Sequence, residues 1–149
     1  MRIVCGSDHA AAALKHEIMD HAAARGHEVT DIGGEGSDYP VTARAAARAV
    51  AKGRFDRGVL FCGTGQGMML AANKVRGIRC AVCSDPYSAL MARRHNDANM
   101  LALGARVLGT ELAKMLVDLF LSTDFEGGRH QRRVSLIGEM EGERAEDDV

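Results

Sequence analysis

The chain has 149 residues, of which 46% are hydrophobic, so it can bury a core in one domain and is not disordered over most of its length. Its 19 basic and 20 acidic residues give a net charge of -1, which excludes a polybasic surface for nucleic acid or a membrane. The sequence shows neither a secretory signal nor a long apolar run, so we expect a cytoplasmic protein with no membrane partner.

The first third of the chain predicts strand, helix, strand, helix. Arg2–Gly6 is short, apolar and β-branched, which indicates a buried strand. A helix follows and ends at Gly26, because apolar residues recur every four positions: Leu14, Ile18 and Ala22. A second strand is predicted at His27–Gly33, and Pro40 begins an alanine-rich helix that reaches Gly53.

The rest of the chain repeats this alternation. Further strands are predicted at Arg57–Gly63, Ile78–Cys83 and Asn99–Gly104. Helices are predicted to follow them, over 67–75, 86–94, from 110 and from about 128. Thr110 is the expected cap of its helix, and the acidic tail from about 142 is expected to fray.

This alternation predicts an α/β fold. Short buried strands that alternate with helices form a three-layer αβα, Rossmann-like domain over 1–149, with a five-stranded parallel sheet and helices on both faces. Ligands of such sheets bind beyond the carboxyl ends of the strands. This rule selects the loops "GSDHAA", "CGTGQG", "SDPYS" and "GARVLG".

The loop "CGTGQG", residues 62–67, follows the third predicted strand, and we call it the glycine loop. Neither a dinucleotide fingerprint nor a Walker loop fits, because Met68 breaks the glycine spacing and no Gly-Lys-Ser/Thr follows. A cysteine phosphatase cradle would need an arginine where Met68 stands. What remains is a row of exposed amides that opens a helix and suits a phosphate or an oxyanion. Cys62 beside it is either an activated thiolate, acting as nucleophile or general base, or a buried small residue.

A second polar group lies in the loop after the first strand. Asp8 and His9 stand at the same sheet edge as Cys62. Asp8 or Ser7 serves equally well as a helix cap, which leaves a chemical role open. His9 is harder to explain as a cap.

Two further groups stand elsewhere. His95 and Asn96 precede the fifth strand, so they lie at the opposite edge and reach the glycine loop only on another subunit, unless they form an ordinary turn. Arg129 and Arg133 share a helical face and suit a phosphate, and Arg106 could join them. The alternative for these arginines is a solvated basic face.

The remaining cysteines and histidines predict no metal site. Cys80 and Cys83 have C-x-x-C spacing within a predicted strand, where they point to opposite faces. His16 and His21 are five positions apart, so they do not lie on the same face of a helix, as two metal ligands would need to.

Taken in order, "GSDHAA", "SDYP", "CGTGQGM", "AANK", "GIR", "HNDAN" and "GGRH" resemble the signatures of the type B ribose-5-phosphate isomerase family, which includes relatives of galactose-6-phosphate isomerase. The resemblance covers nearly the whole chain, and the ordered set is specific although each motif alone is weak. It implies an aldose–ketose isomerase that interconverts ribose 5-phosphate and ribulose 5-phosphate without metal or cofactor. It also implies a homodimer or a dimer of dimers with shared active sites.

The resemblance implies catalytic roles for four residues. Cys62 would move a proton between C2 and C1 of the sugar through an enediolate, with Thr64 near the oxyanion. His95 from the partner subunit would help to open the furanose ring, and Asp8 would contact the sugar there. The remaining matched residues would bind substrate, with His9 and the arginines at the phosphate: His9, Tyr39, Gly63, Gly65, Gln66, Gly67, Asn96, Arg106, Arg129 and Arg133.

The chain departs from the family pattern in places. Ser7 stands where many members have cysteine, and the loop that ends at Tyr39 and Pro40 is shorter than in several members. Met68 stands where other members have glutamate, which places this chain in the group with a cysteine base.

Other functions remain open alternatives. The first is the same isomerisation of another sugar phosphate: allose 6-phosphate, galactose 6-phosphate or a tetrulose 4-phosphate. The others are a non-catalytic flavodoxin-like binding module and a cysteine hydrolase.

Overall fold

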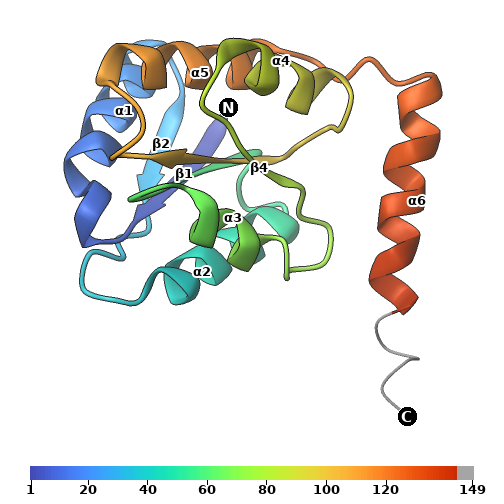
Figure 1. The fold of residues 1–149 in the computed structure, drawn as a ribbon, viewed down its shortest axis with the longest axis horizontal. Coiled ribbons are helices and arrows are strands. Elements are labelled where there is room, and N and C mark those ends of the chain that lie inside the picture. The colour runs from blue at the N-terminus through green and yellow to red at the C-terminus, as the bar shows by residue number, and fades with distance from the viewer. Residues whose placement is uncertain (144–149) are drawn as a thin grey trace.

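A computed structural model describes residues 1–143 and contains a five-stranded, fully parallel sheet in the order β2-β1-β3-β5-β4 (Figure 1). The strands are β1 (Arg2–Ser7), β2 (Glu28–Asp31), β3 (Arg57–Cys62), β4 (Cys80–Val82) and β5 (Met100–Gly104). The predicted α/β fold is confirmed. Only the edge strands β2 and β4 are clearly shorter than predicted, because each has a single neighbour to pair with.

Helices cover both faces of the sheet (Figure 1). On one face lie α1 (Ala12–Ala24), α4 (Pro86–Arg94) and α5 (Thr110–Ser122), and on the other lie α2 (Tyr39–Ala51) and α3 (Gln66–Ala72). Because alternate residues of a strand face opposite sides, Phe61 packs under the first group and Leu60 under the second. This two-sided burial explains why the central strands read as unbroken apolar runs.

The C-terminal helix α6 (Arg129–Glu143) lies beside this layered body, and Glu141 near its end accepts hydrogen bonds from the Gly77 amide at 2.9 and 3.0 Å (Figure 1). An extended segment after α5 leads to it, and its side chains Leu136, Ile137 and Met140 are exposed. The helix begins where the sequence predicts. The rest of the predicted frayed tail, 144–149, lies outside the described residues.

Two local predictions have different outcomes. Thr110 is not the cap of α5: Gly109 occupies the cap position, no side chain caps the helix there, and Thr110 is its first residue. The expected separation of Cys80 and Cys83 is confirmed, since they belong to the cores on opposite faces of the sheet. Among the helices of residues 1–143, none is long and apolar enough to cross a membrane.

A buried lysine ties α1 to the loop that precedes α2. The Lys15 side chain is fully buried and donates hydrogen bonds to Asp31 at 2.9 Å and to Glu35. The Lys15 hydrogen bond is the main cause that lowers the pKa of Glu35. Burial opposes the same shift at Asp31, but Lys15 and the Gly33 amide lower its pKa overall. This triad therefore fixes the loop that leads to Tyr39.

Replacing Lys15 should lower the stability of the protein and change how that stability depends on pH. Lys15→Met leaves two carboxylates without their cation, and because both are about one-third exposed we expect a loss of roughly 2 kcal/mol in the free energy of unfolding. Carboxylates with lowered pKa stabilise the fold fully above their unfolded pKa of about 4, and this contribution is lost as the pH falls from there through their lower folded pKa. Urea unfolding at several pH values should thus show a shallower acid loss in the variant. The exposed Lys52→Met is the control, and equal behaviour of the two variants contradicts the assignment.

Candidate functional site

The loops after β1 and β3 lie side by side at the carboxyl edge of the sheet. Ser7 pairs with Phe61, and the Asp8 amide donates to the Phe61 carbonyl at 3.2 Å. Asp8 caps the 3-10 turn η1 (His9–Ala11), since its Oδ1 accepts from the Ala10 amide at 3.0 Å. The capping alternative is therefore correct for Asp8, yet a cap engages only one carboxylate oxygen, and His9 remains exposed beside it.

The glycine loop wraps around the Cys62 thiol. Cys62 ends β3, is 6% exposed, and its Sγ accepts a hydrogen bond from the Gly65 amide at 3.1 Å. Gly65 has φ +79, and a Cβ there would lie 2.9 Å from Val82 and 3.1 Å from the Leu103 backbone. Only glycine satisfies both the left-handed conformation and this close packing, so the loop is built to turn its amide onto the sulfur.

Two larger side chains border the same loop. A Cβ on Gly67 would lie 2.5 Å from the Tyr39 ring, and one on Gly63 would lie 3.4 Å from the Arg106 Nη1 atom. Tyr39 and Arg106 therefore flank the glycines at van der Waals distance. A cavity of about 290 Å³ opens beside the loop and is lined by Thr64, Gln66, Val82, Cys83, Ser84, Gly104 and Val107.

The other three cysteines are poorly suited to act as a base or a nucleophile. Burial is the main cause that raises the pKa of Cys5 and of Cys80 to about 12, and that of Cys83 to about 11. They stay protonated near neutral pH, when a thiol is a poor base and nucleophile. Of the four cysteines, only Cys62 has a backbone amide directed at its sulfur.

His95 lies at the opposite edge of the sheet from Cys62. It caps the C-terminus of α4 and precedes β5, whereas Cys62 pairs with Gly104 at the far end of β5. Five strand residues at about 3.3 Å each separate the two edges by roughly 15 Å. The structure thus places His95 where the sequence predicted, out of reach of the Cys62 of its own chain.

Two arginines hold the turn that follows His95. Asp97 has φ +46, a left-handed conformation that a non-glycine residue rarely adopts. Its carboxylate accepts from the buried Arg93 at 2.8 Å and from Arg79 at 2.9 Å. Arg79 also donates to the Asn96 carbonyl at 3.0 Å. This clamp fixes the positions of His95 and Asn96.

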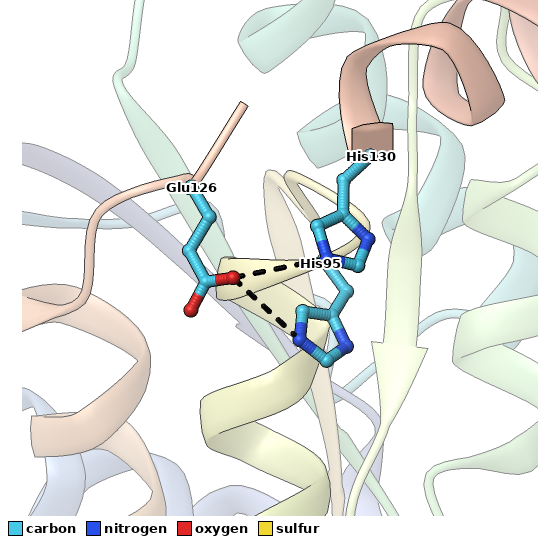
Figure 2. Close-up of side chains that lie close together, drawn as sticks. All are labelled: His95, Glu126 and His130. Carbon is cyan, nitrogen blue, oxygen red and sulfur yellow. Dashed lines mark ion pairs between the residues drawn. The ribbon is translucent and has the colours of Figure 1, made fainter. Parts of the chain in front are cut away.

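His95 stacks on a second histidine (Figure 2). The rings of His95 and His130 are 4.1 Å apart between centroids and 7° from parallel. Glu126 places its Oε2 atom 3.8 Å from the His95 Nε2 and 3.7 Å from the His130 Nε2. Its other oxygen contacts Arg94 Nε at 3.1 Å. We call these three residues the His95–His130–Glu126 cluster.

The predicted phosphate residues are divided between the two edges. Arg106 and His9 lie near the glycine loop, whereas Arg129 and Arg133 belong to α6, near His130. No contact of the described residues joins Arg106 to Arg129 or Arg133, so the expectation that Arg106 joins them stays a prediction.

Neither potential metal-ligand group among the described residues suits a cation. The carboxylates near His16 are held by Lys15. In the His95–His130–Glu126 cluster the two stacked rings keep their nitrogen lone pairs in two nearly parallel planes, and Arg94 pairs with the carboxylate. Zinc requires converging donors and a site free of competing cations. The cluster therefore lacks the features of a zinc site.

Comparison with known proteins identifies the family of the chain. The family model for ribose/galactose isomerase matches residues 3–137. This chain belongs to that family. The ribose-5-phosphate isomerase B of Escherichia coli is 53% identical over 96% of this chain and 98% of its own length. The D-erythrulose-4-phosphate isomerase of Pectobacterium atrosepticum is 46% identical over 95% of both chains.

A solved structure supports the assignment. The ribose-5-phosphate isomerase B of Clostridium thermocellum has a TM-score of 0.94 and 52% identity, and it covers 97% of this chain and 99% of its own. The resemblance to type B ribose-5-phosphate isomerases is thereby confirmed, and so is the prediction that the chain is an isomerase rather than a binding module or a hydrolase.

Two members of the His95–His130–Glu126 cluster were missed in the sequence. His130 lies in the "GGRH" motif and Glu126 directly before it, but no role was assigned to either. The only local signal is the i,i+4 spacing of Glu126 and His130, which also occurs by chance in many helices. Their contact with His95 arises from tertiary packing, which no local pattern reveals.

Proposed function

We propose that the chain interconverts ribose 5-phosphate and ribulose 5-phosphate, with Cys62 as the base. The observation that carries this proposal is the geometry at Cys62. This residue ends β3, and its sulfur accepts the Gly65 amide at 3.1 Å, within the loop whose Thr64 and Gln66 line a cavity. The Gly65 N–H is a hydrogen-bond donor already directed at the sulfur, where it can interact with the sulfur while Cys62 acts as a base. Met68 is fully buried and has no ionisable group, so it offers no alternative base.

The chemistry follows from this arrangement. The Cys62 thiolate takes the C2 proton of the open-chain aldose, the C2–H electron pair forms the C1–C2 double bond, and the aldehyde oxygen becomes an oxyanion. Amides of the glycine loop and the Thr64 hydroxyl stabilise that charge. The 2-hydroxyl proton moves to the oxygen on C1, and the thiol returns its proton to C1 to give the ketose. The net reaction moves two protons and needs no redox partner.

Ring opening is assigned to the second chain of a homodimer. In the furanose the C1–ring oxygen bond must break: the ring oxygen takes a proton from His95 of one chain, and the C1 hydroxyl gives its proton to Asp8 of the other. The roughly 15 Å between the edges of the sheet supports this division. The exposed apolar side chains Leu136, Ile137 and Met140 on α6 supply a surface that a partner would cover.

In the proposed dimer, residues of both chains would bind the phosphate. His9 and Arg106 lie at the carboxyl edge, and Arg129 and Arg133 would arrive from the partner on α6. Guanidinium groups from both chains then meet one phosphate, which suits their paired donors. Tyr39, held against Gly67, and Asn96 would line the sugar between these two ends.

The second candidate is the same reaction on another sugar phosphate, such as allose 6-phosphate, galactose 6-phosphate or a tetrulose 4-phosphate. The similarity to a D-erythrulose-4-phosphate isomerase favours keeping the last of these. We expect kcat/KM to be highest for ribose 5-phosphate in a panel of these four substrate classes, measured by coupled assay. If ribose 5-phosphate reacts roughly 100-fold more slowly than a tetrose phosphate, equivalent to about 2.7 kcal/mol of transition-state binding, the first choice is wrong.

Removing the thiol should abolish turnover. Cys62→Ser is expected to lower kcat at least about 100-fold, because a serine hydroxyl is a poor base, while inorganic phosphate still binds and competes. Cys80→Ser is the matched control, since Cys80 is 7% exposed against 6% for Cys62 and lies in the same core. Turnover of Cys62→Ser at the rate of the control variant would refute the base assignment.

Mixed subunits test the shared site. His95→Ala and Cys62→Ala chains are each inactive alone, but a mixed dimer retains one site with an intact Cys62 and an intact His95. Random exchange makes half the dimers mixed, each with one working site in two, so we expect roughly a quarter of the wild-type activity. Native mass spectrometry verifies the exchange. Verified mixed dimers without recovered activity would show that each site is built by one chain.

A further inference from the structure

His130 is an unexpected residue in α6. The other side chains described on this helix are exposed or half-buried, yet His130 is only 6% exposed. It contributes little to the apolar core, and the roles proposed above leave it unused. A buried histidine costs desolvation unless it has a partner, so its contact with His95 calls for a physical explanation.

The turn that precedes α6 places the His130 ring against the His95 ring. Gly127 and Gly128 have φ of +65 and +55, conformations that glycine adopts freely, and the His130 amide donates to the Gly127 carbonyl at 3.0 Å. The preceding segment is held to α4, because the Glu126 amide donates to the Arg94 carbonyl at 3.0 Å. Backbone contacts therefore set the position of the His130 ring independently of substrate.

The surrounding charges favour a neutral His130. Burial is the largest cause that lowers its pKa, and the His95 ring and the Arg129 guanidinium act in the same direction. Arg133 adds to this effect, and Glu126 opposes it. Two imidazolium rings 4.1 Å apart would repel each other, which is why the His95 ring acts in this direction.

We propose that His130 is a positioning residue for ring opening: its ring stacks on His95 and holds it in the plane from which His95 gives a proton to the ring oxygen of a cyclic sugar phosphate. This inference rests on the proposed function of His95. Stacking restricts the rotation of the His95 side chain, which is otherwise half-exposed at the end of α4. A fixed ring keeps the proton donor within reach of the sugar, and small misplacements of such groups slow reactions strongly.

Sugar chemistry separates this role from the chemistry at Cys62. Ribose 5-phosphate is largely a furanose and must open before its C2 proton can leave. Ribulose 5-phosphate carries its carbonyl at C2 and its phosphate on O5, so no free hydroxyl can close a five-membered ring on C2. It enters the site as an open chain. A residue that serves only ring opening should matter for ribose 5-phosphate and not for proton exchange of ribulose 5-phosphate.

The experiment compares both substrates in one set of variants. For His130→Ala we expect kcat for ribose 5-phosphate to fall about tenfold or more, while deuterium uptake from D₂O into ribulose 5-phosphate changes less than about twofold. His130→Phe restores a flat ring that stacks without titrating, so it should keep ribose turnover within about threefold of the wild type. The exposed Gln131→Ala on the same helix is the control.

Each outcome bears on the inference. Equal loss of both activities in His130→Ala, no loss of either, or a His130→Phe variant as slow as His130→Ala would overturn the positioning role. Because deuterium uptake requires a folded glycine loop, it also reports whether the variant is intact. Failure of the proposed function looks different, since the wild-type protein would then neither consume ribose 5-phosphate nor exchange ribulose 5-phosphate.

Discussion

The parallel sheet is the constraint on which the rest of the structure depends. All five strands run in one direction, so every strand-to-helix loop opens at one edge and every helix-to-strand turn at the other. Cys62 and Asp8 gather at the first edge because β1 and β3 are neighbours there. His95 is held to the second edge because it ends α4 just before β5. No side-chain rotation can bring these two groups together within one chain.

At the carboxyl edge, the conformation of one backbone turn determines what surrounds the Cys62 sulfur. The left-handed φ of Gly65 points its amide at the Cys62 sulfur, and the absence of a Cβ allows the loop to press against β4 and β5. The glycines at 63 and 67 leave room for Arg106 and Tyr39. One run of alternate glycines thus directs an amide at the Cys62 sulfur and leaves space for the two larger side chains that flank the loop.

The fold and the carboxyl edge were predictable because their signals are local. The strand periodicity, the glycine spacing and a cysteine at a strand end each lie within a few residues, and they correctly predicted the loop around Cys62. The same reasoning missed the buried Lys15, since a lysine on a helical face normally predicts solvent and only the pairing with Asp31 and Glu35 explains its burial. It also missed the stacking of His130 on His95, which joins residues 35 positions apart in the sequence through α6, a helix whose placement no local pattern predicts.

On the proposed function, the division between edges separates two chemical tasks. Proton transfer between C2 and C1 needs the Cys62 edge, and opening of a cyclic sugar needs the His95 edge of the partner. The first task is common to every aldose–ketose pair, whereas the second arises only for sugars with a free hydroxyl that can reach the carbonyl. A tetrose 4-phosphate cannot form a five-membered ring, because its O4 is esterified. Substitutions near His95 and His130 would then alter the use of pentose and hexose phosphates while leaving a tetrose phosphate nearly unaffected, so the substrate range within this fold can shift at one edge without disturbing the base at the other.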